Sequence, residues 1–256
     1  MTFTNMARMA LVVLASVGVL GQGAEAEDLR VAFGQARPPF VHEEGGAWKG
    51  FEIDIVREAL AHRGHTIKSK RHVSNARLAR EVATGGKDVA VSVQKTGDGT
   101  AYSEVFVEYR NYAISRSRDS LTIESIQDLP KYRPVAWQNA YLALGPSYAA
   151  LFGPEAKGSH LRGYREFADQ KAQSAYFWKG RANLILVDKT IFEWFRSQLA
   201  GDYETSVDVT YHAIFGEGTP FYVAFRSEKI RDDFNAGLAH LRSSGRYDEL
   251  VAAYLK

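Results

Sequence analysis

The apolar positions of this chain follow two periods, and their order predicts a mixed α/β protein. Some apolar residues form short continuous runs, as in buried strands. Others recur every three or four positions, as on the buried face of a helix. The runs that predict strands lie at residues 29–33, 89–93, 135–137, 183–187 and 221–225, and the helical patterns at residues 51–64, 190–199 and 230–254. Because strands and helices alternate, we expect right-handed crossovers and mostly parallel sheets.

The pattern restarts once along the chain, which predicts two lobes. Residues 27–113 form one α/β unit and residues 114–215 a second. The helices within residues 216–256 need a sheet to pack on, so we expect this segment to return to the first lobe. The chain would then cross between the lobes twice, near residues 112–119 and 211–218. Strand ends of both lobes would meet at a cleft.

The first 26 residues are organised like a secretory signal peptide. Arg8 precedes an apolar run at residues 9–20, and Ala24 and Ala26 supply the small residues of an A-x-A cleavage site. The run is shorter than the ~20 residues of a membrane-spanning helix, so a membrane anchor is a less favoured interpretation. A buried N-terminal helix is also less favoured. We therefore expect a soluble periplasmic protein that begins at Glu27.

Composition narrows the possible functions. The chain has no cysteine, so it cannot form a disulfide and must be stabilised by its core. Its formal net charge is +2, which does not favour nucleic acid or an anionic membrane as a partner. The seven histidines show no metal-ligand spacing, and we find no phosphate-binding loop, dinucleotide motif or nucleophile elbow. We expect a monomer without metal, cofactor or catalytic residues.

Several motifs then carry a family resemblance. They are RPPF at residues 37–40, GFEIDI at 50–55, GKDV at 86–89 followed by Thr96, GRAN at 180–183 followed by Asp188, and GTPFYVAF at 218–225. In this order they resemble the extracellular solute-binding proteins of family 3. The resemblance implies a two-lobed periplasmic binding protein fold with two hinge crossings. It also implies closure on a small polar solute, commonly an amino acid, for delivery to an ABC importer.

The resemblance and the expected cleft together predict seven ligand-binding residues. They are Arg37, Phe40, Phe51, Thr96, Gln138, Asn139 and Asp188. Asp188 matches the family carboxylate that receives a ligand ammonium, and it is also placed to cap the helix that follows. The arginine that forks onto an amino acid carboxylate in the family is missing after Thr96. Arg37 could replace it or could be a solvated loop residue.

Other functions stay open at this point. An enzyme of the cyclohexadienyl dehydratase kind could use Glu104, Glu108 and Asp188 as general acid and base. A receptor in the membrane, in place of an ABC permease, could recognise the closed form. The incomplete amino acid clamp favours a cationic or amine-bearing solute, or a carboxylate held by Arg37.

Overall fold

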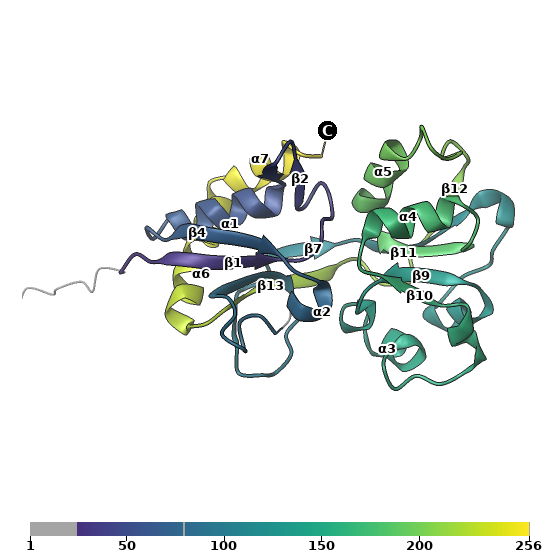
Figure 1. The fold of residues 1–256 in the computed structure, drawn as a ribbon, viewed down its shortest axis with the longest axis horizontal. Helices are drawn as coiled ribbons and strands as arrows, with labels where there is room; N and C mark the ends of the chain where they lie inside the picture. The colour runs from purple at the N-terminus through teal and green to yellow at the C-terminus, as the bar shows by residue number, and fades with distance from the viewer. Residues whose placement is uncertain (1–24, 79, 256) are drawn as a thin grey trace, which may run out of the picture.

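The computed structural model describes residues 25–78 and 80–255, and it shows two α/β lobes side by side (Figure 1). Most of the expected signal peptide lies outside the described residues. Within the part of the chain that is described, no helix is both long enough and apolar enough to cross a membrane.

The first lobe is built on a six-stranded sheet with the order β4-β1-β5-β13-β6, to which β7 adds by pairing with β13. Its strands are β1 (Asp28–Phe33), β4 (Thr66–His72), β5 (Val89–Val93), β6 (Ala101–Tyr102), β7 (Val107–Tyr109) and β13 (Thr219–Phe225). Its helices are α1 (Phe51–Ala61), α2 (Asn75–Leu78), α6 (Glu228–Ser243) and α7 (Arg246–Ala252). A small hairpin, β2 (His42–Glu44) with β3 (Ala47–Lys49), turns at Gly45 and Gly46.

The second lobe has a five-stranded sheet with the order β10-β9-β11-β8-β12. Its strands are β8 (Asn111–Arg116), β9 (Pro134–Trp137), β10 (Arg165–Phe167), β11 (Leu184–Asp188) and β12 (Val209–His212). Its helices are α3 (Pro146–Phe152), α4 (Gln170–Trp178) and α5 (Lys189–Gln198). It also contains the short 3-10 helices η1 (Ser117–Asp119), η2 (Ile126–Lys131), η3 (Ala140–Leu142) and η4 (Ser159–Arg162).

Each sheet has a parallel half and an antiparallel half. The parallel pairs are β4-β1-β5 in the first lobe and β10-β9-β11 in the second. The antiparallel strands β7, β8, β12 and β13 are those that lead from one lobe into the other. These strands have no crossover helix beside them, and this explains why the sheets are less parallel than the sequence pattern predicts.

The two crossings differ in length. The first is Arg110 alone, which lies between the last residue of β7 and the first residue of β8. It therefore comes before residues 112–119, where the sequence analysis placed it, because the whole of β8 pairs within the second sheet. The second crossing, residues 213–218, falls in the expected segment. The predicted return of the C-terminal segment is observed, since β13 pairs with β5 in the first sheet.

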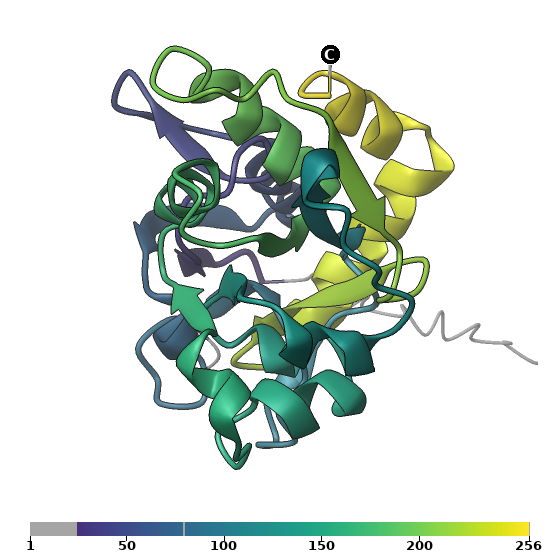
Figure 2. The same ribbon diagram turned by 90° about the vertical axis from the view of Figure 1, so that its right-hand side faces the viewer.

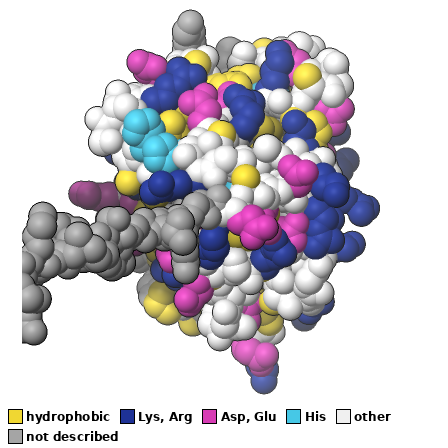
Figure 3. All heavy atoms as spheres, turned by 90° about the vertical axis from the view of Figure 1, so that its left-hand side faces the viewer, with side chains coloured by type: hydrophobic (Ala, Val, Ile, Leu, Met, Phe, Trp, Pro, Cys, Tyr) yellow, Lys and Arg dark blue, Asp and Glu magenta, His cyan; other side chains and the backbone are white. Residues whose placement is uncertain are grey.

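The C-terminal helices complete the first lobe. α6 packs against α1 and α7. The C-terminal helical segment, in yellow, lies on the right-hand side of the view that faces the second lobe (Figure 2). The contact with α1 is close, because a Cβ atom on Gly237 would lie 2.0 Å from the carbonyl oxygen of Ala59. On the outer end of the first lobe, acidic and basic side chains are interspersed (Figure 3).

Candidate functional site

A cavity that is partly open to solvent lies between the lobes, where the strand ends of both sheets meet. The first lobe lines it with Arg37, Asn75, Leu78, Ser92, Val93, Gln94, Tyr109 and Phe221. The second lobe lines it with Asn111, Trp137, Gln138, Asn139, Leu142, Ala143, Gln170, Asp188 and Ile191. Four of the seven predicted ligand-binding residues are therefore brought together here: Arg37, Gln138, Asn139 and Asp188.

Asp188 ends β11 and caps α5. Its Oδ1 accepts the backbone N–H groups of Thr190 and Ile191 at 2.8 and 3.2 Å. Its Oδ2 accepts the N–H of Arg110, the first crossing, at 2.8 Å. Burial raises the pKa of Asp188 to about 6, although these three N–H groups act to lower it. A carboxylate has room for about four hydrogen bonds, so Oδ2 can accept one more donor.

Arg37 belongs to a buried polar cluster at the base of the cavity. Its Nη2 donates to Glu52 at 2.8 Å, and its Nε donates to the Tyr109 hydroxyl at 2.7 Å. That hydroxyl donates in turn to the other oxygen of Glu52 at 2.5 Å. Burial alone would lower the pKa of Arg37, but the Glu52 charge and Tyr109 raise it. The guanidinium thus faces the cavity with its charge already matched by Glu52.

Ser92 is the extra residue of a bulge in β5. Tyr222 and Val223 of β13 pair with Val93 and Val91, so Ser92 has no partner in the ladder. Its φ of 61° lies in the left-handed region, which is rare for residues other than glycine and asparagine. Its buried Oγ has no hydrogen-bond partner among the described residues. A strained residue with an unpaired hydroxyl at a cavity wall indicates a site of function.

Side-chain amides dominate the remaining polar surface of the cavity. The Oε1 atoms of Gln138 and Gln170 are buried and unpaired within the described residues. Asn139, also with a positive φ of 62°, donates its backbone N–H to Glu166 at 3.0 Å. The side-chain amide of Asn111 donates to the Thr219 hydroxyl at 3.0 Å. Asn111 directly follows the first crossing and Thr219 directly follows the second, so this bond links the two crossings.

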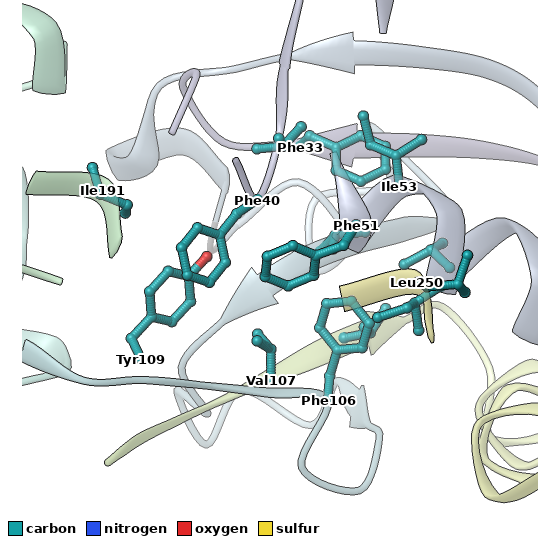
Figure 4. Close-up of a cluster of buried hydrophobic side chains, with 14 of the residues drawn as sticks. Phe33, Phe40, Phe51, Ile53, Phe106, Val107, Tyr109, Ile191 and Leu250 are labelled. Carbon is teal, nitrogen blue, oxygen red and sulfur yellow. The ribbon is translucent and has the colours of Figure 1, made fainter. Parts of the chain in front are cut away.

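Three predicted ligand-binding residues do not line the cavity. Phe40 and Phe51 are buried in the core of the first lobe, where Phe40 stacks on Tyr109 with ring centres 4.3 Å apart (Figure 4). Their rings therefore support the residues beneath the cavity. Thr96 lies in a loop outside the cavity, where its hydroxyl donates to Asp98 at 2.8 Å.

The carboxylates proposed for an enzyme are not assembled. Of Glu104, Glu108 and Asp188, only Asp188 lines the cavity, and the two glutamates are exposed. Over residues 25–78 and 80–255 there is also no group of three histidine, aspartate or glutamate side chains that could hold a metal ion.

Much of the cavity wall is formed by residues that were not among the seven predicted. Ser92 lies near the end of β5, Gln94 follows it and Trp137 ends β9, so the rule that ligands bind at strand ends could have found them. Asn75, Gln170 and Phe221 carried no comparable signal in the sequence.

The comparisons agree with this geometry. The profile of the bacterial extracellular solute-binding proteins, family 3, matches residues 29–256, while no curated protein matches the chain. The solved structures that share its fold include the following three. The arginine-, lysine-, histidine-binding protein ArtJ from Geobacillus stearothermophilus is 15% identical, with a TM-score of 0.69 over 89% of this chain and 94% of that one. The ancestral amino acid-binding protein AncCDT-1, a precursor of cyclohexadienyl dehydratase, is 20% identical, with a TM-score of 0.67 over 90% and 95%.

A histidine kinase sensor domain with similarity to periplasmic binding proteins is 15% identical, with a TM-score of 0.71 over 88% and 95%. At such identities these structures support the two-lobed fold alone. The profile match runs from β1 through the end of the chain and so includes both lobes and the cavity between them. The chain therefore belongs to the bacterial extracellular solute-binding proteins, family 3.

Proposed function

We propose that this protein is a periplasmic receptor that closes on a small polar solute, an amino acid or an amine-like compound, and presents it to an ABC permease. The cavity between the lobes carries the proposal. Ser92, Gln138 and Gln170 line it with buried polar atoms that lack partners in the described structure. Such atoms destabilise a protein unless a ligand or water satisfies them.

The crossings support a mechanism of closure. Arg110 is fixed to the second lobe on both sides, since its N–H binds Asp188 and its carbonyl accepts the N–H of Lys189 at 3.0 Å. Rotation of the lobes would then bend the chain between Tyr109 and Arg110 and within residues 213–218. Asp188 would thus link the ligand site to the hinge.

The proposal is tested by identifying the solute. The protein is purified from its native periplasm and denatured, and the released compound is identified by mass spectrometry. Adding this compound back should raise the melting temperature in a saturable way. Recovery of the compound unchanged after incubation supports a receptor, whereas a converted product would support the dehydratase-like alternative.

A filled cavity provides the matched control. Ala143→Trp places a large side chain at the cavity wall and should abolish the thermal shift, whereas Ala150→Trp, on the exposed side of α3, should retain it. If Ala143→Trp folds and binds as tightly as the parent, the solute binds elsewhere and the proposal is wrong.

A further inference from the structure

We infer that the solute is a cation of the amine or guanidino class that carries no carboxylate group. This inference rests on the proposed function and concerns the same cavity. It follows from the charges at the cavity wall, the helix ends that reach the wall, and the aromatic rings beside it.

The charge of the cavity wall favours a cationic solute. Among the described residues, Arg37 and Asp188 are the charged side chains that line the cavity. The positive charge of Arg37 is matched by Glu52, which is fully buried and 2.8 Å away. Asp188 has no cationic side chain within ion-pair distance in the described structure; its partners are backbone N–H groups. The net charge that faces a ligand is therefore negative when Asp188 is ionised.

The helix ends do not offer an anion site either. Gln170 and Ile191 bring the first turns of α4 and α5 to the cavity wall, and a free helix N-terminus there would attract a carboxylate. Both ends are already capped by aspartates. Asp169 accepts the N–H groups of Lys171 and Ala172, and Asp188 does the same for α5. A ligand carboxylate would thus meet the charge of Asp188 at the cavity wall, and the N–H groups at both helix ends are already occupied.

The neutral polar groups do not replace a missing cation. The side-chain amides of the cavity can donate hydrogen bonds, but they cannot neutralise a carboxylate that has been removed from water. A carboxylate at Arg37 would have to share the guanidinium with Glu52. An ammonium or guanidinium group fits the charge, the polar groups and the aromatic rings of the cavity wall. It complements Asp188, donates to the amide oxygens, and can lie against the aromatic faces of Tyr109, Trp137 and Phe221.

The test compares compounds that differ only in the carboxylate. Calorimetry is run with agmatine against L-arginine and with cadaverine against L-lysine. We expect each decarboxylated compound to bind at least about tenfold tighter than its amino acid. Asp188→Asn, which keeps a good N-cap, should weaken binding of the amines by roughly 30-fold or more. The control is Asp128→Asn, the same change at a backbone-bound aspartate of the second lobe outside the cavity, which should leave affinity unchanged.

The outcomes separate this inference from the proposed function. Tighter binding of arginine or lysine than of the matching amine overturns the inference but leaves the receptor function intact. The inference is equally wrong if none of the four compounds binds while the solute recovered from the periplasm carries a carboxylate. If no solute is recovered and no compound gives a thermal shift, the receptor function itself fails.

Discussion

Replacing Arg37 should reduce the stability of the protein, whatever it does to ligand binding. In Arg37→Met the Glu52 carboxylate stays fully buried and keeps only the Tyr109 hydroxyl as a partner. Removing one member of a buried ion pair costs about 3–5 kcal/mol of unfolding free energy. For a chain of this size, that corresponds to a fall in melting temperature of roughly 6–20 °C.

A double variant separates the lost charge from the lost packing. Glu52→Gln alone should also be destabilising, because it leaves the Arg37 charge buried and unmatched. In the combination Arg37→Met/Glu52→Gln no charge remains, and Gln can still accept the Tyr109 hydroxyl. We expect the double variant to be more stable than either single variant, because a buried pair replaced as a whole is often nearly neutral.

Urea unfolding followed by tryptophan fluorescence at neutral pH measures all three variants. Lys49→Met, which breaks an exposed ion pair with Glu44, is the control and should leave the unfolding midpoint unchanged. If Arg37→Met loses less than about 1 kcal/mol, the pair behaves like a surface ion pair and our description of the cluster is wrong. Simple additivity of the two single losses in the double variant would refute the coupling.

Three further predictions concern pH, packing and processing. Because the pKa of Asp188 is raised to about 6, the affinity for amines should fall as pH drops below this value. The free protein should lose up to roughly 3 kcal/mol of unfolding free energy as pH rises through the same pKa, because the folded state holds the proton more tightly than the unfolded state. Asp188→Asn should remove the first trend in calorimetry and the second in urea denaturation. Gly237→Ala should cost about 1–3 kcal/mol or more because its Cβ would collide with Ala59, whereas Gly201→Ala, with open space around it, should cost nothing in the same urea assay. N-terminal sequencing of exported protein should begin at Glu27; an intact first methionine would contradict a cleaved leader.

Much of the fold follows from local patterns. The strands β1, β5, β9, β11 and β13 are mostly apolar and mostly buried, and α1 and α6 show clear helical periodicity. Burial forces these patterns on the sequence, so they can be recognised without a structure. The short edge strands β10 and β12 are only partly buried, and this explains why their sequences gave no comparable signal.

The first crossing could not be located in the same way. Residues 107–116 form an almost continuous extended segment, and the change from one sheet to the other at Arg110 depends on which strands they pair with.

In the site, too, some features could be predicted from the local sequence and others depend on contacts between distant segments. Gln138, Asn139 and Asp188 follow buried strands in the sequence, so their place at the cavity could be predicted from strand order. The bulge at Ser92 depends on the register between β5 and β13, which are far apart in the chain. The pairing of Arg37 with Glu52 likewise exists only once the proline-containing loop has folded onto α1.

The place of β13 also determines the order in which the lobes can fold during synthesis. This strand lies between β5 and β6, so the first lobe has an incomplete sheet until residues 219–225 have emerged. All five strands of the second lobe lie within residues 111–212. The second lobe along the chain is therefore the first that can complete its sheet. Until β13 has been made, the N-terminal strands keep an open sheet edge. In this state newly made protein is most exposed to aggregation and to chaperones.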